Sequence, residues 1–393
     1  MTLVSFVIPS YNRSKHLKIG LQEIEKLNYD FPYEIIVIDN ASSDDSVEMI
    51  RRDFPDAKLF PLENNFGAKS RNIGIDEAKG DMIVMLDDDS YPLPGTIEGG
   101  IKVLESEAGK DVGSIAFNIL QADGTYWTNG LFPAFTGCGA MFRKRLFDEI
   151  GAYPDNYLYY TEEYDISCRI WANGQRVVNF RELECFHFKA SLNRNFNNIM
   201  NRLVRNNILL WRKYLPKEIA DDQVKTEVWR YRNIALKEGA MDGFESGLKE
   251  GDEVTREYMD GKNPHLMRED AALKMLGYLN IVDRIDQLAS DMPGASVLLF
   301  NIGKVMHLII RTLREIGLKI AGIIDDNAYM QKDTFEGLDV HGRDAFNSLS
   351  YDCVVIGSLS ISLNDEFEKE LCEMNLEKPV IRMADFDRLS DYF

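Results

Sequence analysis

The first ninety residues alternate short apolar runs rich in β-formers with stretches of helical periodicity, and this rhythm limits the fold more than any other feature. The predicted strands are "LVSFVI", "YEIIVID", "AKLFPL" and "DMIVML", and the predicted helices between them cover residues 13–27, 43–52 and 68–78. Strands that are apolar throughout and separated by helices form parallel sheets with helices on both faces. The sequence therefore predicts an α/β fold.

Acidic residues close two of these strands. Asp39 ends the second strand, and Asp87, Asp88 and Asp89 follow the fourth. Because ligands of parallel sheets bind beyond the carboxyl ends of the strands, we expect these acids at one rim. Alternate residues of an extended strand share a face, so Asp87 and Asp89 are expected to point together while Asp88 points away.

Three adjacent carboxylates are costly unless a cation or hydrogen-bond donors compensate them. Oxygen ligands suit Mg²⁺ or Mn²⁺, which use one or two carboxylates together with substrate phosphates. The triplet therefore predicts a divalent metal that holds a diphosphate. A solvated acidic turn ahead of Pro92 is the alternative that the triplet by itself leaves open.

The rest of the chain divides into further segments. Helices are expected at residues 96–106 and from Thr161, whose side chain is expected to cap the helix, with strands near 112–118 and 140–142. An α/β rhythm restarts near residue 296 after a helical stretch of mixed charge. We predict a first α/β domain over residues 1–216, a helical connector over 217–290 and a second, Rossmann-like domain over 291–393.

The second α/β domain carries a degraded glycine fingerprint. The segment "NIGKVM" keeps Gly303 but has Asn301 and Met306 at the outer positions. Asn301 is expected to disfavour the tight first turn, and Met306 to crowd the contact between helix and strand. We therefore expect a scaffold for contacts between copies or with a partner, without a dinucleotide, and Asp325 as a strand-end cap.

Charge and composition narrow the classes of protein. A net charge of −19 counts against general nucleic-acid binding, and the chain lacks the apolar run of a membrane span and the layout of a signal peptide, so a cytoplasmic location is the default expectation. The five scattered cysteines are expected to be reduced and mostly buried. The segment 193–217, in which a helix is predicted over 193–214, combines an apolar stripe with arginines. This combination is typical either of an interfacial helix or of a helix packed on the first domain.

Four segments carry a family resemblance: "VSFVIPSYNR", "EIIVIDNASSDDS", "ENNFGAKSRNIGIDEAKGDMIVMLDDDS" and "GCGAMFRKRLFDEIGAYPDNYLYYTEEYDISCR". Together they resemble glycosyltransferase family 2, whose members have the GT-A fold, over roughly residues 3–215. The ending "RNNILLWRKYLP" is similar to rhamnosyltransferase-type members that build bacterial surface polysaccharides.

The resemblance implies a binding site for a nucleoside-diphosphate sugar and a metal. It places Pro9, Tyr11 and Arg13 in the loop after the first strand, beside the nucleotide, and implies that Asp39 accepts a hydrogen bond from the base. It also implies that Asp89 is the principal metal ligand and that Asp87 and His187 are further ligands. For His187 a purely structural role stays open. The implied nucleotide-binding residues are Pro9, Tyr11, Arg13, Asp39, Asn40, Arg71, Asp87 and Asp88.

The resemblance also implies the catalytic base. In "YYTEEYDIS", Glu163 stands where the family has the acid that deprotonates the acceptor hydroxyl, and Glu162 is the alternative. Asp165 would contact the acceptor or support the site. The glycine-rich stretch 137–139 would lie behind the sugar pocket, where missing side chains let the substrate approach.

The implied function is a metal-dependent, inverting transfer, with Mn²⁺ or Mg²⁺, from a UDP- or dTDP-linked sugar to a glycan or glycolipid hydroxyl in bacterial surface polysaccharide synthesis. A peripheral contact with the inner membrane face through 193–217 and self-association through the C-terminal domain are further expectations. The alternatives are a non-catalytic nucleotide-sugar binding or assembly protein and a protein-directed glycosyltransferase. A nucleotidyltransferase would usually need a glycine-rich triphosphate loop, whereas "IPSYNRSKH" has no glycine.

Overall fold

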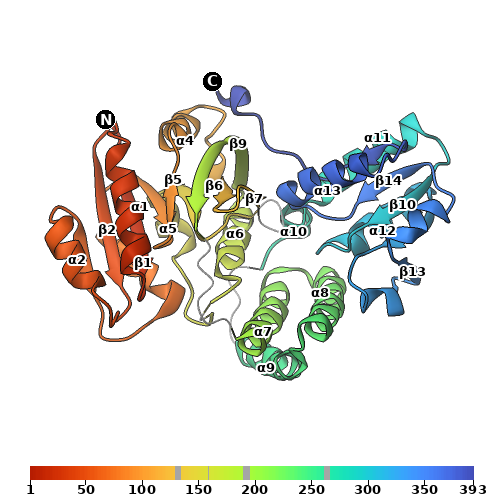
Figure 1. The fold of residues 1–393 in the computed structure, drawn as a ribbon, viewed down its shortest axis with the longest axis horizontal. Helices are drawn as coiled ribbons and strands as arrows, with labels where there is room; N and C mark the ends of the chain where they lie inside the picture. The colour runs from red at the N-terminus through yellow and green to blue at the C-terminus, as the bar shows by residue number, and fades with distance from the viewer. Residues whose placement is uncertain (129–133, 158, 189–194, 261–265) are drawn as a thin grey trace. The chain divides into compact units, whose positions relative to one another are not determined.

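The computed structural model describes residues 1–128, 134–157, 159–188, 195–260 and 266–393. Packing divides the chain into two compact units (Figure 1). The first comprises Met1–Trp127, Pro133–Leu192 and Phe386–Phe393, and the second comprises Thr128–Phe132 and Asn193–Asp385. The domain limits at 216/217 and 290/291 stay predictions, since the units follow packing and not the chain alone.

The first part of the first unit is a parallel sheet, as the sequence predicted. The strand β1 (Val4–Ser10) lies between β2 (Tyr33–Asp39) and β4 (Met82–Leu86), and β3 (Lys58–Pro61) is parallel to β2. The connecting helices are α1 (Ser14–Lys26), α2 (Ser46–Asp53), the 3₁₀ turn η1 (Gly67–Ser70) and α3 (Arg71–Glu77). This arrangement brings the carboxyl ends of β1, β2 and β4 to one rim.

The second part of this unit extends the sheet with antiparallel pairings, in the order β3-β2-β1-β4-β8-β6-β9-β5, with β7 paired to β6. The added strands are β5 (Ser90–Pro92), β6 (Val112–Gln121), β7 (Tyr126–Trp127), β8 (Gly139–Arg143) and β9 (Arg176–His187). The helices here are α4 (Thr96–Glu105), α5 (Arg145–Ile150) and α6 (Glu162–Ala172). The α/β class expected from the sequence is therefore confirmed.

Alternation along β1 shows why both faces of this sheet are covered. Phe6 and Ile8 belong to one apolar cluster with Leu17 of α1, whereas Val7 belongs to a second cluster with Ile75 of α3. All five side chains are buried, and each contributes about 1.5–3 kcal/mol through removal from water. The rim that carries the acids therefore rests on a core packed from both sides.

The last eight residues return to the first unit. Asp387 accepts a hydrogen bond from the backbone nitrogen of Asn179 on β9 at 2.9 Å, and its own backbone nitrogen donates to the Asn179 carbonyl oxygen at 2.9 Å. Tyr392, in η4 (Leu389–Tyr392), packs edge-on against Phe180 with ring centroids 5.2 Å apart. The predicted C-terminal domain, residues 291–393, includes this segment, because no local pattern in the sequence indicates its distant partner.

The second unit combines a helical part with a second sheet. Its sheet is ordered β12-β13-β11-β10-β14-β15 and is parallel except for the β12–β13 hairpin. The strands are β10 (Ser296–Phe300), β11 (Lys319–Ile324), β12 (Thr334–Phe335), β13 (Leu338–His341), β14 (Cys353–Ile356) and β15 (Val380–Ile381). The helices are α7 (Phe196–Tyr214), α8 (Lys217–Glu238), α9 (Met241–Met259), α10 (Glu269–Met275), α11 (Tyr278–Asp291), α12 (Met306–Ile316) and α13 (Ile361–Glu373), with 3₁₀ turns η2 (Met330–Lys332) and η3 (Arg343–Asn347).

Helix α7 packs closely on α9 and α8 (Figure 1). Gly243, Gly247 and Gly251 of α9 allow this approach, because a side chain at Gly243 would meet the Asn197 carbonyl oxygen at 2.1 Å. The apolar residues Met200, Val204, Leu210 and Trp211 of α7 are buried. Helices α8 and α9 of the same unit thus pack against this helix. Residues 193 and 194 lie outside the described residues.

The loop after β10 corrects one expectation about the fingerprint. Asn301 adopts φ 65°, a left-handed conformation that asparagine tolerates better than most residues, so the tight turn forms without the glycine. Helix α8 covers this loop: Arg230 donates to the Ile302 carbonyl oxygen at 2.9 Å, and Lys304 pairs with Glu227 at 2.9 Å. Asp325 accepts the backbone nitrogens of Ile302 and Asn327, which is the expected strand-end cap.

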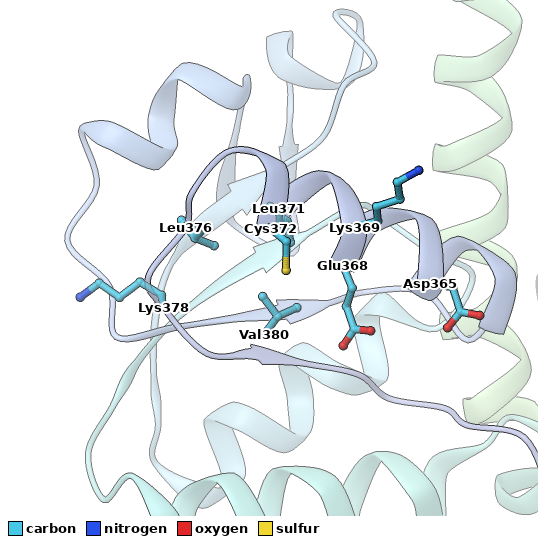
Figure 2. A pocket seen from close by; sticks show the side chains of 8 residues that line it. All are labelled: Asp365, Glu368, Lys369, Leu371, Cys372, Leu376, Lys378 and Val380. Carbon is cyan, nitrogen blue, oxygen red and sulfur yellow. The ribbon is translucent and has the colours of Figure 1, made fainter.

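A pocket of about 420 Å³ lies between α13 and β15. Figure 2 shows Glu368 and Cys372 pointing from α13 toward Val380 of β15. Its lining residues are Asp365, Glu368, Lys369, Leu371, Cys372, Leu376, Lys378 and Val380. None of the residues predicted to bind the nucleotide or the metal is among them, so this pocket is not the predicted site.

No helix in the described part of the chain is long and apolar enough to cross a membrane.

Candidate functional site

The three aspartates lie in the turn that joins β4 to β5, and not in a strand as the alternation argument assumed. The backbone nitrogen of Ser90 donates to the Asp87 carbonyl oxygen at 3.2 Å, and the backbone nitrogen of Asp87 donates to Ser90 Oγ at 2.9 Å. β5 then pairs with β9 so that Ser90 is opposite His187. The turn therefore directs the three carboxylates toward different partners around His187.

Each carboxylate has a cationic partner. Asp87 pairs with Arg71, whose guanidinium is buried. Arg13 Nη1 lies 3.0 Å from Asp88 Oδ1 and 3.0 Å from Asp89 Oδ2, and Asp88 also accepts the backbone nitrogen of Tyr11 at 3.0 Å. Buried carboxylates are tolerated only when paired in this way, so the cluster is a built polar site and not a solvated turn.

His187 contacts the cluster from β9. Its Nε2 lies 3.0 Å from Asp89 Oδ1. Burial lowers the pKa of His187, but Cys138 and the hydrogen bond with Asp89 outweigh burial and raise it to about 11. Burial raises the pKa of Asp88 to about 7 against the pull of Arg13. Without a bound cation, a protonated His187 therefore balances part of the negative charge.

The residues present fit a divalent cation. Ligand atoms of Asp87, Cys138 and His187 all lie within 4.8 Å of one another, and Asp89 contacts His187. Of these, Asp87, Asp89 and His187 were predicted as metal ligands and Cys138 was not. The register of β4 and β8, which pairs Leu86 with Gly139, brings Cys138 to Asp87. No sequence pattern reveals a pairing between strands more than fifty residues apart.

The rim beside β2 offers an unpaired acceptor. Asp39 is buried, its Oδ2 accepts the backbone nitrogen of Ser42 at 2.9 Å, and its Oδ1 has no hydrogen-bond partner among the described residues. Asn40 donates to Ser70 Oγ at 2.9 Å and accepts the backbone nitrogen of Phe66 at 3.2 Å. A ring N–H of a base would satisfy the free oxygen of Asp39, whereas Asn40 holds the surrounding loops together.

The loop after β1 contributes two of its three predicted residues. Tyr11 and Arg13 lie beyond the strand, and Tyr11 is 45% exposed, which leaves its ring open to a ligand. Pro9, predicted in this loop, is buried within β1 and is paired with Ile38 of β2. The strand extends one residue past Pro9, because its partner β2 continues to Asp39.

The predicted base lies at the start of α6. Tyr160 and Thr161 both have φ 70°, so Thr161 does not cap the helix as expected, and its hydroxyl donates to the Tyr160 carbonyl oxygen at 2.5 Å. Burial and the neighbouring Glu163 raise the pKa of Glu162 above its ordinary value. Glu162 Oε2 is buried without a hydrogen-bond partner in the described residues. The pair therefore holds a carboxylate that takes up protons readily.

Arg71 connects the two halves of the site. Interactions with Asp87, Tyr153, Glu162 and Glu163 keep the pKa of its guanidinium above the ordinary range in spite of burial. The guanidinium also lies 5.5 Å from the ring centroid of Tyr153. One predicted metal ligand, Asp87, and the two predicted bases are therefore neighbours of the same buried guanidinium.

Asp165 has a different environment from the two glutamates. Its side chain is fully buried and accepts hydrogen bonds from Arg169 at 3.0 and 2.9 Å. Arg169 in turn donates to the carbonyl oxygens of Ile150, Gly151 and Ala152 at 2.6–2.8 Å. The Asp165–Arg169 pair thus fixes the chain between α5 and α6, which places Asp165 in support of the site.

Removal of this pair is expected to destabilise the fold. Asp165→Ala leaves Arg169 buried without its carboxylate, which costs about 3–5 kcal/mol. Urea unfolding followed by circular dichroism measures the loss. Asp155→Ala is the matched control, because the Lys69–Asp155 pair is at the surface and its removal should cost no more than about 1 kcal/mol. Equal stability of the two variants would contradict the structural role of Asp165.

Comparisons with known proteins match two segments of the chain to described families. Residues 5–151 match the family described as "Glycosyl transferase family 2", and residues 294–381 match "C2185-like, N-terminal". The chain is 32% identical over 167 residues to the "Uncharacterized glycosyltransferase YwdF" of Bacillus subtilis, covering 38% of this chain and 60% of the relative. It is 31% identical over 110 residues to the "UDP-Glc:alpha-D-GlcNAc-diphosphoundecaprenol beta-1,3-glucosyltransferase WfaP" of Escherichia coli, covering 27% of this chain and 43% of the relative. The chain thus spans less than two thirds of either relative.

Among solved structures, the chain is similar to Staphylococcus aureus TarS 1-349 in complex with UDP-GlcNAc. The likeness has a TM-score of 0.46 and 18% identity, and it covers 60% of this chain and 73% of that one. The two sheets confirm the predicted α/β class of both domains, and residues 5–151 match the family that the first domain resembles.

Proposed function

We propose that this protein is a metal-dependent, inverting glycosyltransferase, because residues 5–151 match the family described as "Glycosyl transferase family 2". It transfers a sugar from a UDP- or dTDP-linked donor to a hydroxyl of a glycan or glycolipid in bacterial surface polysaccharide synthesis. The observation that carries the proposal is that ligand atoms of Asp87 and His187 lie within 4.8 Å of each other, with Asp89 3.0 Å from His187 and with Arg71 beside Asp87 and the two glutamates.

Donor binding is assigned to the rim of the parallel sheet. The free Oδ1 of Asp39 accepts an N–H of the base, and Tyr11 lies beside it on the loop after β1. Arg13 and Arg71 provide positive charge for the diphosphate. The name of the E. coli relative contains a UDP-linked donor and a lipid-linked acceptor, which supports both classes as substrates here.

The metal, Mn²⁺ or Mg²⁺, would be held by Asp89, Asp87 and His187, and when bound it supplies charge neutralisation for the departing nucleoside diphosphate. Glu163 accepts the proton of the acceptor hydroxyl as its oxygen bonds to the anomeric carbon. The bond from that carbon to the diphosphate oxygen breaks on the opposite face, so the configuration inverts. Glu162 is the neighbouring acid, and Asp165 positions the helix that carries both.

A thermal-shift panel tests donor binding. UDP or dTDP with Mn²⁺, at about 100 times the dissociation constant, should stabilise the protein by about 2.7 kcal/mol and raise the melting temperature by about 5–10 °C. GDP and ADP should shift it less, because Asp39 selects the base. Asp39→Ala should reduce the shift, whereas Asp53→Ala, a surface change on α2, should leave it intact. A panel without any nucleotide-dependent shift would refute donor binding.

Turnover separates the enzyme from a binding protein. A non-catalytic nucleotide-sugar binding or assembly protein would show the same thermal shift. It would release no UDP or dTDP when the donor is supplied with an acceptor, whereas a glycosyltransferase would. A protein acceptor in place of a glycan would identify a protein-directed enzyme in the same assay.

The two predicted contacts with larger partners are kept as proposals. Because the apolar side chains of α7 are buried, a contact of this helix with the cytoplasmic face of the membrane would depend on basic side chains such as Arg202 and Arg205. Reversing their charge should release the protein from anionic liposomes. Self-association through the C-terminal domain is supported by β15, which is an edge strand of the second sheet among the described residues. This strand also borders the pocket shown in Figure 2.

A further inference from the structure

A cysteine thiol lies inside the proposed metal site. Cys138 is 3% exposed, and its sulfur lies within 4.8 Å of a carboxylate oxygen of Asp87 and a ring nitrogen of His187. These three residues offer one sulfur, one oxygen and one nitrogen. The proposed transfer reaction uses the oxygen and the nitrogen but has no use for the sulfur.

The fold fixes this thiol in place. Cys138 precedes β8, whose Gly139 pairs with Leu86 at the end of β4. A side chain at Gly139 would meet Ile119 Cδ1 at 2.9 Å and the Cβ of Cys185 at 3.1 Å, so the backbone packs tightly there. Asp87 and His187 come from the ends of β4 and β9. Asp87 thus directly follows β4, Cys138 directly precedes β8 and His187 is the last residue of β9, so the ends of three strands position the three side chains.

The ligand set does not suit Mg²⁺ alone. Mg²⁺ takes oxygen ligands in octahedral geometry, whereas thiolate and imidazole together favour Zn²⁺ and related cations. With Zn–S near 2.3 Å and Zn–N near 2.0–2.1 Å, ligand atoms of a tetrahedral site lie about 3.5 Å apart. The ligand atoms of Asp87, Cys138 and His187, which all lie within 4.8 Å of one another, therefore have to approach by about 1 Å. Asp89 contacts His187 at 3.0 Å from outside this group.

We propose that Asp87, Cys138 and His187 form a site for a thiophilic divalent cation such as Zn²⁺, with Cys138 as the ligand that sets this preference. Three protein ligands leave the fourth tetrahedral position open, and Asp87 and His187 are also the proposed ligands of the cation that transfer uses. Zn²⁺ thus competes with the cation that transfer requires. The inference deepens the proposed metal site, and its test measures metal binding and not sugar transfer.

Cobalt is the probe, because a thiolate bound to Co²⁺ gives a near-ultraviolet charge-transfer band and a tetrahedral site gives strong visible bands. The reduced full-length protein, titrated with Co²⁺, should develop both, and Zn²⁺ should remove them. Cys138→Ser should lose the near-ultraviolet band and bind Zn²⁺ at least about 100-fold more weakly, as loss of even an outer partner costs up to this much. Cys185→Ser and Cys168→Ser, at two other buried cysteines, should keep the band.

Each outcome decides the inference. Circular dichroism confirms folding, and Cys138→Ala provides a second variant if Cys138→Ser unfolds. A wild-type protein without the near-ultraviolet band, or a band unchanged in both Cys138 variants, overturns the site. A normal band in a protein that UDP and dTDP with Mn²⁺ do not stabilise would leave this inference standing and refute the proposed donor site. A protein that UDP or dTDP with Mn²⁺ stabilises, but that lacks the near-ultraviolet band with Co²⁺, would refute only the thiolate ligand.

Discussion

Asp89→Asn is expected to lower kcat by about 10³-fold. Asp89 is 1% exposed and contacts both Arg13 and His187. The amide keeps the volume of the side chain but removes the charge that holds the cation. Neutralisation of the leaving diphosphate by the cation is worth several kcal/mol, and a 10³-fold loss in kcat corresponds to about 4 kcal/mol. The measurement is the release of UDP or dTDP at saturating donor over a range of Mn²⁺ concentrations.

The comparison variant for this experiment is Asp81→Asn. Asp81 stands just before β4, and its carboxylate only accepts the backbone nitrogen of Leu3 at 3.4 Å, so its loss should change kcat less than twofold, roughly. Thermal unfolding of both variants separates a lost site from a lost fold. If Asp89→Asn turned over like Asp81→Asn, the metal-dependent mechanism would have to be abandoned.

The rim of the site could be predicted because the signals are local. Apolar runs of β-formers with helices between them define β1, β2 and β4, and the order of a parallel sheet puts the ends of these strands together. Asp39 and Asp87 therefore meet the same edge without any knowledge of packing. The resemblance to a family then added the residues whose positions depend on loops, such as Arg13.

The parts that sequence reasoning missed depend on long-range packing. Cys138 reaches Asp87 through the register of β4 and β8, and Asp387 reaches Asn179 across more than two hundred residues. Neither contact leaves a periodic pattern. The left-handed Thr161 was missed for another reason: threonine before two glutamates is the usual signature of a side-chain cap, and here the backbone overrides it.

The start of α6 shows what this override achieves. Two consecutive residues other than glycine in the left-handed region, Tyr160 and Thr161, are energetically costly and persist only when the surrounding structure holds them. They orient the first turn so that Glu162 is buried next to Glu163 and near Arg71. With a regular side-chain cap, the first turn of α6 would have a different orientation. The strained backbone at Tyr160 and Thr161 therefore determines the position of the proposed base.

Glu163→Gln is expected to lower kcat by about 10²–10⁴-fold, the usual contribution of a general base. The glutamine keeps the shape of the side chain but cannot accept the proton of the acceptor hydroxyl. Glu162→Gln should retain most of the activity, because its neighbour still supplies a carboxylate. Initial rates at saturating donor and acceptor measure both variants, and a larger loss in Glu162→Gln would assign the base to Glu162 instead.

The pH dependence of the same variants identifies how the pair works. A base acts only when deprotonated, so wild-type kcat should rise with pH as the pair of glutamates loses its shared proton. Because burial and the charge of Glu163 raise the pKa of Glu162, this rise should lie above the ordinary glutamate value of 4.5. Glu162→Gln removes one of the two carboxyl groups, so Glu163 no longer has a charged neighbour with which it shares a proton. The rise of kcat in this variant should therefore move to lower pH. Glu163→Gln should stay inactive from acidic to alkaline pH. A profile in Glu162→Gln that coincides with that of the wild type would show that the two glutamates do not share a proton.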